Sequence, residues 1–574
     1  MKNKKILLIY LISFVLVILN SCSKQSDNLN AIPEDAIFVT SFDVKSLVKK
    51  AKLNDFEEMN FYKFFETEFK NENPEIAVKF KEILDNPLST GIDFLSNSYL
   101  FVVAKSQKET YLGFTIGLRS STKFEEFITD FSTTSKMPLD IEDITDFKVL
   151  KIQNNRGTII GWDDEKLLIL NSIDDNFSGQ EGDKIFKDYY KKLITQEKSN
   201  SIVQNSSFKD FNKNSKDIST WLSLSIINKI AKESEYRQIS QTFDPKLLDE
   251  SYLTAHLEFN NGEINLTYKG EYDDKLIEQF ANENIIKDDF DTKLLEQVSA
   301  KQYFVLSFGL LLNKYYENLQ KLPQFAMLGI GIEDEFEKNL GISIYDLLST
   351  FDGDFLVTLN DIQLQTSEQN IKQDVWVPGF YDKQNRWHPG MYQYKDTLIV
   401  KEQLVPIITL CTSFNNKDVF TNLMSKIPPE ILTTNSDYYE INLEGVKIYS
   451  MYKDGILIFS NGLDIITKVK SGGYGSESLA DDDLSKNISD NYSFMFLSLD
   501  YENYPAAIKS KIEENISGKS ALFSSIIGIY DNLKVEATDL KNVKVTIKLK
   551  TDDENSLFTI IDSFDKNMND LMQL

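Results

Sequence analysis

The side chains that most often perform catalysis or bind metals are scarce in this 574-residue chain. It contains two cysteines, Cys22 and Cys411, and two histidines, His256 and His388. A structural zinc site needs about four Cys or His ligands, and a Ser-His-Asp or Cys-His site needs a histidine beside its nucleophile. We therefore expect no structural zinc, and nucleophilic catalysis would have to use one of only two histidines.

Sequence motifs for common reactions are also missing. The chain contains no G-x-x-x-x-G-K-[ST], no G-x-S-x-G and no H-E-x-x-H, so phosphate-binding loops, esterases and zinc proteases find no support. Carboxylates are too abundant for their spacing to single out a glycosidase pair. His256 lies within a predicted strand and Cys411 follows the apolar run Ile407–Leu410, which favours structural roles for both. We predict no catalytic residues and no cofactor.

Two acidic stretches invite a metal hypothesis. Asp174, Asn176, Ser178 and Gly179 have the opening of a calcium loop, but the twelfth position, where a bidentate acid is needed, is Ile185. A solvated loop is the simpler interpretation, and we predict no metal site. The residues 481–483, all aspartate, lie in the Gly/Ser-rich stretch 471–490, which we expect to be a mobile acidic loop.

The N-terminus carries an export signal. A basic segment, Met1–Lys5, precedes the apolar run Ile6–Leu19, which has the length of a signal-peptide core. The following Leu19-Asn-Ser-Cys22 resembles the lipobox of bacterial lipoproteins. This resemblance implies removal of residues 1–21, lipidation of Cys22 and attachment to a membrane through the lipid. The alternative is an ordinary signal peptide with an incidental cysteine. Residues 22–32 are expected to form a polar tether.

Charge limits the partners and the location. The net charge is −26, and −29 without the three lysines of the signal peptide, so nucleic acid is a poor candidate partner. The charge could also serve solubility alone. Surface-exported bacteroidete lipoproteins tend to carry an acidic cluster after the cysteine, whereas only Asp27, with Lys24 before it, occurs here. We therefore expect the periplasmic face of the outer membrane.

The chain also repeats itself. A predicted strand, Ile37–Phe42, is followed by an amphipathic helix, and Phe38, Val39, Ser41 and Phe42 are matched by Phe304, Val305, Ser307 and Phe308. Later matches keep the same order along the chain, which coincidence explains poorly. We predict an α+β protein of two tandem similar units, residues 33–285 and 286–574, each with a mainly antiparallel sheet and covering helices.

The second unit carries an insertion. The spacing between matched residues grows from 254 at Phe355 to 293 at Phe420, which places an insert at about 362–402. The insert contains turn signals at Val377-Pro-Gly379 and His388-Pro-Gly390. Aromatic side chains on a projecting hairpin are good contact groups for a protein or a glycan. The alternative is that they pack on the insert's base or on the neighbouring unit. The candidate partner-binding residues are Trp376, Tyr381, Trp387 and Tyr392.

Three features together indicate a family. The lipobox, the segment Ile32-Pro-Glu-Asp-Ala-Ile-Phe-Val-Thr-Ser-Phe-Asp-Val44 and Gly91-Ile-Asp93 resemble an uncharacterised family of bacteroidete cell-envelope lipoproteins, known only as a domain of unknown function. The resemblance brings no catalytic residues. We expect a lipid-anchored, non-enzymatic envelope protein with a binding or scaffolding role. The alternatives are a periplasmic carrier of a hydrophobic ligand, held in a cavity under the sheets, and a hydrolase with a carboxylate site.

Overall fold

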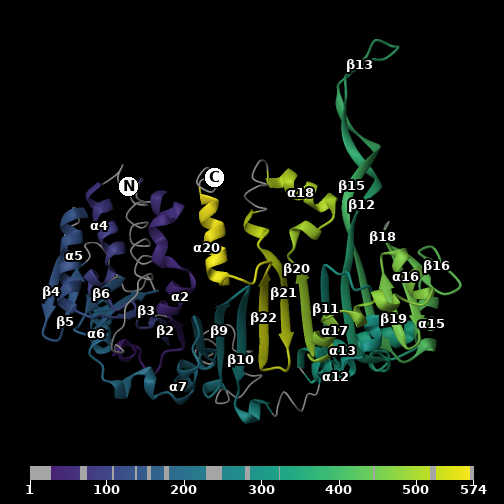
Figure 1. The fold of residues 1–574 in the computed structure, drawn as a ribbon. Coiled ribbons are helices and arrows are strands. Elements are labelled where there is room, and N and C mark those ends of the chain that lie inside the picture. The colour runs from purple at the N-terminus through teal and green to yellow at the C-terminus, as the bar shows by residue number, and fades with distance from the viewer. Residues whose placement is uncertain are drawn as a thin grey trace. The chain divides into compact units, whose positions relative to one another are not determined.

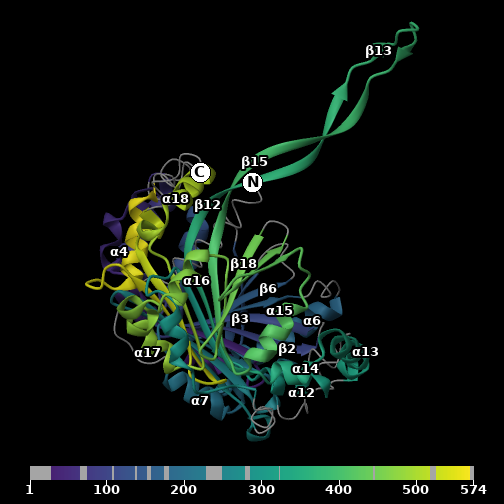
Figure 2. The ribbon, with the colours of Figure 1, turned by 90° about the vertical axis from the view of Figure 1, so that its right-hand side faces the viewer.

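The chain forms two compact units. The structure is a computed structural model that describes residues 27–64, 67, 74–106, 109–135, 139–151, 157–173, 180–227, 248–277, 285–321, 323–443, 446–516 and 525–568 (Figures 1 and 2). Unit 1 comprises Met1–Asn284 and Ser525–Leu574, and unit 2 comprises Ile285–Ser524. The prediction of a second unit over 286–574 did not anticipate that Ser525–Leu574 groups with unit 1, where Asn542–Leu549 pairs with Glu263–Glu271.

Unit 1 contains an antiparallel sheet with the strand order β4-β5-β6-β7-β3-β2-β1-β8-β9-β10-β22-β21. β9 and β10 form a hairpin that turns at Asn260-Asn-Gly262. The strands are β1 (Phe38–Phe42), β2 (Ser98–Ser106), β3 (Glu109–Gly117), β4 (Asp140–Ile144), β5 (Phe147–Lys151), β6 (Thr158–Trp162), β7 (Lys166–Ser172), β8 (Ile218–Ser223), β9 (Tyr252–Asn260), β10 (Glu263–Glu271), β21 (Tyr530–Ala537) and β22 (Asn542–Leu549).

Helices cover both faces of this sheet near β3 and β7. Leu168 and Leu170 pack with α6, whereas Leu167 packs with α5 on the opposite face, as the alternation of strand side chains requires. Burial on both faces explains why β7 is almost continuously apolar. The helices of unit 1 are η1 (Asp27–Ala31), α2 (Val44–Lys50), η2 (Leu53–Glu58), α4 (Pro74–Asp85), η3 (Pro87–Thr90), α5 (Ser121–Ser135), α6 (Gln180–Ile194), η5 (Lys198–Asn200), η6 (Ile202–Gln204), α7 (Ser206–Lys213) and α20 (Ser556–Lys566).

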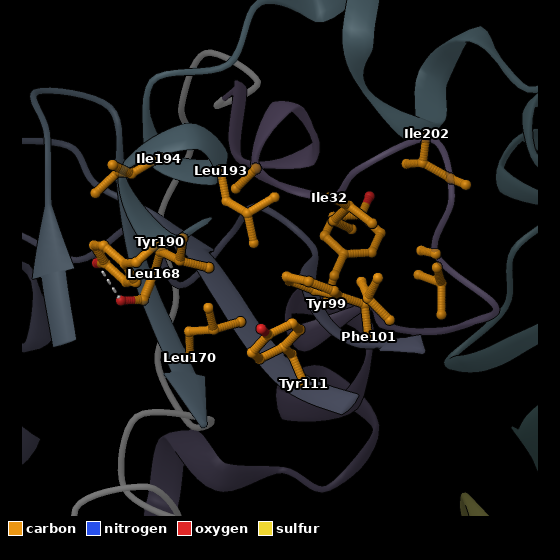
Figure 3. Packing of buried hydrophobic residues seen from close by; sticks show 14 of the residues in the cluster. Ile32, Tyr99, Phe101, Tyr111, Leu168, Leu170, Tyr190, Leu193, Ile194 and Ile202 are labelled. Atoms are coloured by element: carbon orange, nitrogen blue, oxygen red, sulfur yellow. Dashed lines mark hydrogen bonds between the residues drawn. The ribbon is translucent and has the colours of Figure 1, made fainter. Parts of the chain in front are cut away.

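The core of unit 1 begins earlier in the chain than expected. Figure 3 shows Ile32 beside Tyr99 and Phe101, and Tyr190 donating a 2.9 Å hydrogen bond to the Leu168 carbonyl. Ala31 and Ile32 are fully buried. The predicted tether of residues 22–32 is therefore folded from Asp27 onward, because two apolar side chains at its end join the core. Cys22 lies outside the described residues.

The strands of unit 2 pair in the antiparallel order β16-β17-β18-β19-β15-β12-β11-β20. A separate short pair, β13–β14, lies at the end of the β12–β15 hairpin. The strands are β11 (Phe304–Gly309), β12 (Phe351–Val377), β13 (Phe380–Tyr381), β14 (Trp387–His388), β15 (Met391–Phe414), β16 (Leu432–Thr434), β17 (Tyr439–Leu443), β18 (Val446–Lys453), β19 (Ile456–Ser460) and β20 (Ser493–Ser498).

The helices of unit 2 include a segment that was predicted as a mobile loop. Within 471–490 the chain forms three short helices, because Leu479, Leu484 and Ile488 are buried in the core. The helices are η8 (Thr292–Gln297), α12 (Leu312–Gln320), α13 (Pro323–Leu340), α14 (Ile344–Leu348), α15 (Lys417–Ser425), α16 (Leu463–Lys470), η9 (Gly475–Glu477), η10 (Leu479–Asp481), α17 (Leu484–Ser489), η11 (Tyr501–Asn503) and α18 (Ala506–Ile516).

The two strand orders correspond element by element. From β4 to β8 in unit 1, each strand has a counterpart in the same position between β16 and β20 in unit 2. The first five residues of β7 and the five residues of β19 also share one burial pattern, with the fourth residue less buried than the others. Shared order is what a duplication would produce. That the two sets descend from one ancestral unit stays a prediction.

Candidate functional site: an aromatic arm

The predicted insert forms a two-stranded ribbon that leaves the sheet of unit 2. β12 is 27 residues long and β15 is 24. β11 accompanies β12 only as far as Leu359, and β19 accompanies β15 only as far as Thr409. Beyond Asp361 and Ile407, the two strands pair with each other up to Val377 and Met391. We call residues 362–406 the arm; its outer part extends clear of the other elements of unit 2 (Figures 1 and 2).

The arm is long compared with ordinary hairpins. Sixteen residues from Ile362 to Val377, at about 3.3 Å per residue, span about 50 Å. Neither strand has a second neighbour along this length in the part of the chain that the structure describes. An isolated two-stranded hairpin is only marginally stable in water, so the arm depends on a well-fixed root.

Polar side chains fix that root. A bulge at Asn360 interrupts the register between Leu359 and Asp361, where bulges commonly bend a strand. Thr358 and Thr409 both donate to the Asn360 side-chain oxygen at 3.4 Å. Where β19 ends, Asn461 takes the place of a strand neighbour. Its side-chain oxygen accepts from the Ile408 N–H at 2.8 Å, and its amide donates to the Pro406 carbonyl at 2.7 Å.

All four predicted partner-binding residues lie at the far end of the arm and face solvent. Trp376 is 53% exposed, Tyr381 64%, Trp387 55% and Tyr392 69%. The structure brings them together as two ring pairs: Trp376 meets Tyr392 at 5.0 Å between centroids, and Tyr381 meets Trp387 at 4.9 Å. We call residues 376–392 the tip.

Three further exposed side chains of this region were not among the predicted set. Phe380 and Met391 belong to the tip, and Tyr394 lies just below it on β15. Phe380 stacks on His388 at 5.0 Å. Phe380 and Met391 each directly follow a Pro-Gly turn signal. These signals could have indicated both positions, since residues next to a turn lie at the end of a hairpin.

The tip turn is held together by one carboxylate. Asp382 accepts backbone hydrogen bonds from Gln384 and Arg386, both at 2.9 Å, and a side-chain bond from Arg386 Nε at 2.8 Å. His388 Nε2 lies 3.2 Å from the same carboxylate. The backbone hydrogen bond from Arg386, aided by the His388 and Arg386 side chains, lowers the pKa of Asp382. The carboxylate therefore stays ionised and keeps the turn closed.

Two glycines let the indole rings lie against the backbone. A Cβ on Gly379 would stand 2.4 Å from the Trp387 ring, and a Cβ on Gly390 would stand 2.4 Å from the Trp376 ring. Non-bonded carbon atoms do not approach each other this closely, so only glycine permits these contacts without a shift of the ring or the backbone. The two Pro-Gly turns predicted from the sequence thus position the tryptophans as well as reversing the chain.

The histidine within unit 1 has the surroundings of a structural residue. His256 Nδ1 lies 2.8 Å from the Ser219 hydroxyl, which also accepts from the Lys216 N–H at 2.7 Å. Phe211 stacks on the imidazole at 5.6 Å. Burial, with a smaller contribution from Lys216, lowers the pKa of His256. Because Ser219 is fully buried, a substrate cannot reach this hydroxyl.

Unit 2 contains two further candidate sites, the thiol of Cys411 and a surface pocket. Cys411 is fully buried, and burial raises the pKa of its thiol to about 12, which makes it a poor nucleophile at neutral pH. An open pocket of about 580 Å³ is lined by Ser299, Ala300, Lys301, Asp464, Lys468, Tyr474 and Glu477. Because this pocket is open, it would leave much of a bound ligand in water, whereas sites for apolar ligands bury most of the ligand surface.

The described residues offer few other candidates. They contain no group of three or more His, Cys, Asp or Glu side chains that could hold a metal ion, and no helix among them is both long and apolar enough to span a membrane. The possible calcium loop at Asp174–Gly179 lies outside the described residues.

Comparison with known proteins places the chain in a family without a described activity. No curated protein matches it. The solved structure entitled "Structure of crystal form I of TP0453" has 11% identity over 45% of this chain and 84% of its own, with a TM-score of 0.22, too low to indicate a shared fold. A family profile matches residues 28–557. The chain belongs to the family described as Domain of unknown function (DUF4836).

Proposed function

We propose that this protein is a non-catalytic binding or scaffolding protein of the bacterial cell envelope, anchored by a lipid on Cys22 and making its partner contact through the arm. The observation that carries the proposal is the aromatic tip at the end of a rooted, free-standing ribbon. The lipobox-like Leu19–Cys22 supports the anchor and the outer-membrane location. Both remain proposals.

The physical basis is the cost of the tip in water. Large apolar side chains gathered on one exposed surface mark interaction sites in soluble proteins. Trp and Tyr are enriched at the centres of interfaces because they bury a large area and carry a polar handle. Asn360 and Asn461 hydrogen-bond the arm at its root. With the root fixed, the aromatic side chains of the tip lie too far along the arm to pack against the sheet of unit 2.

Site-specific photocrosslinking in living cells tests this role. A photoreactive amino acid at Tyr381 should form adducts with envelope material, because the ring is exposed at the tip. The matched control is Tyr315 on α12, which is also exposed and lies in the same unit. We expect adducts at Tyr381 and background at Tyr315. Equal labelling at both positions, or none at Tyr381, would contradict a contact through the arm.

A further inference from the structure

We propose that the tip binds the interfacial region of a lipid bilayer, which names the partner class of the contact proposed above and rests on that proposal. The tip presents Trp, Tyr, Phe and Met side chains together with Lys383 and Arg386. Trp and Tyr favour the boundary between headgroups and acyl chains, where one end of the ring is apolar and the other is hydrated. Basic side chains beside them favour the same depth.

The charge of the arm differs from that of the chain. The arm contains five acidic and five basic residues and has no net charge, whereas the chain carries −26. Within the tip, Asp382 is outnumbered by Lys383 and Arg386. The net negative charge of the chain, which should repel an anionic membrane surface, therefore comes from residues outside the arm.

The length of the arm gives this charge separation a consequence. Electrostatic repulsion decays over about 8 Å at physiological ionic strength. An arm of about 50 Å holds its tip several such lengths from the acidic surface of unit 2. A contact with a protein pocket needs no such distance, whereas an acidic protein that touches an anionic lipid surface does.

Several polar groups of the tip are already paired with one another, which lowers the free-energy cost of transferring the tip from water into a bilayer. Asp382 pairs with Arg386 and His388 and accepts two backbone N–H bonds. The Asp382 N–H donates to the Arg386 carbonyl, and the Asn385 N–H to the Asp382 carbonyl. Unpaired polar groups are expensive to bury and paired ones are much less so.

Shape favours a bilayer over a protein partner. The tip is convex and narrow, with aromatic side chains on both β13–β14 and the adjacent ends of β12 and β15. A protein would need a matching pocket around all of them to bury this surface. A bilayer interface deforms around an inserted tip and buries its whole circumference.

The chain contains its own fluorescent reporters for this contact. Trp376 and Trp387 are the exposed tryptophans at the tip, while Trp162 and Trp221 in unit 1 are each only 2% exposed. Transfer of the tip into a bilayer should shift tryptophan emission to shorter wavelength. Quenching by brominated acyl chains should act on the tip pair alone, because Trp162 and Trp221 are enclosed by the core of unit 1.

The experiment uses the mature chain, residues 22–574, with Cys22→Ser so that no lipid anchor contributes. It is mixed with vesicles of phosphatidylethanolamine and phosphatidylglycerol, and binding is followed by flotation and by bromolipid quenching. The triple variant Phe380→Ser, Tyr381→Ser, Trp387→Ser should lose partitioning by at least about tenfold. The control variant Leu398→Ser, Val400→Ser removes exposed apolar side chains lower on the arm and should bind as the parent does.

The outcomes separate this inference from the proposed function. Absence of vesicle binding by the parent chain overturns the lipid assignment, as does equal loss in the control variant. Tyr381 adducts that contain protein or glycan, with no vesicle binding, overturn the lipid assignment but leave the arm as the contact surface. Absence of any tip-specific adduct overturns both. Vesicle binding that is lost only in the tip variant, with lipid adducts at Tyr381, supports both.

Discussion

The β2–β3 hairpin of unit 1 and the β12–β15 hairpin of unit 2 occupy the same position in their strand orders but differ in length. Each lies between the strand that opens its unit's sheet, β1 or β11, and the strand β7 or β19. β2 and β3 have nine residues each, whereas β12 and β15 have 27 and 24. The additional length forms the arm.

The two hairpins also differ in what surrounds them. In β2 and β3, Phe101 and Tyr111 are buried in the core of unit 1. Along the arm, Leu364, Leu398 and Val400 are exposed. The β2–β3 hairpin is thus stabilised by packing, whereas the outer half of the β12–β15 hairpin is stabilised by the hydrogen bonds between its two strands and by its root.

The largest predicted effect contrasts these two environments. Phe101→Ala should lower the free energy of unfolding of unit 1 by about 3–5 kcal/mol, because it leaves a cavity in the core. Val400→Ala in the arm should change stability by less than about 0.5 kcal/mol. Urea unfolding followed by Trp162 and Trp221 emission measures the first, and far-ultraviolet circular dichroism measures the second. A loss above about 2 kcal/mol for Val400→Ala would show that the arm is packed.

A smaller effect is predicted at the root of the arm. Asn461→Ala removes the hydrogen bonds to the Ile408 N–H and the Pro406 carbonyl. The local cost should be about 1 kcal/mol, equivalent to about fivefold faster hydrogen exchange of the Ile408 amide. Asn171 is the next-to-last residue of β7 in unit 1 and accepts from the Thr158 hydroxyl, so Asn171→Ala is the control and should leave Ile408 unchanged. Unaltered exchange in Asn461→Ala would mean that the root is held by other contacts.

Much of this architecture was predictable because local patterns carry it. The apolar run Ile37–Phe42 predicted β1 within one residue. The change in spacing between Phe355 and Phe420 located the insert, and its Pro-Gly turns placed the reversal of the chain. The aromatic residue types then identified the tip, since no other part of the insert combines rings with turns.

The remainder depends on contacts that sequence spacing does not encode. β4 is a strand of mostly acidic residues whose assignment comes from pairing with β5, so no hydrophobic pattern predicted it. The C-terminal segment joins unit 1 through the pairing of β22 with β10, a choice of neighbour made in three dimensions. The side chains of Asn360 and Asn461 fix the root through hydrogen bonds across the sheet, and each is an ordinary polar residue in the sequence.

The arm deletion tests the central claim most directly. Residues 362–406 are replaced by Asn-Gly, so that Asp361 and Ile407, which pair in the parent chain, flank a two-residue hairpin, and the variant is compared with the parent chain. Thermal unfolding reported by Trp162 and Trp221 should keep its midpoint within about 2 °C, because no core residue is removed. Crosslinking capture of envelope material should fall to background. Capture at the parent level by a folded, armless chain would contradict the account.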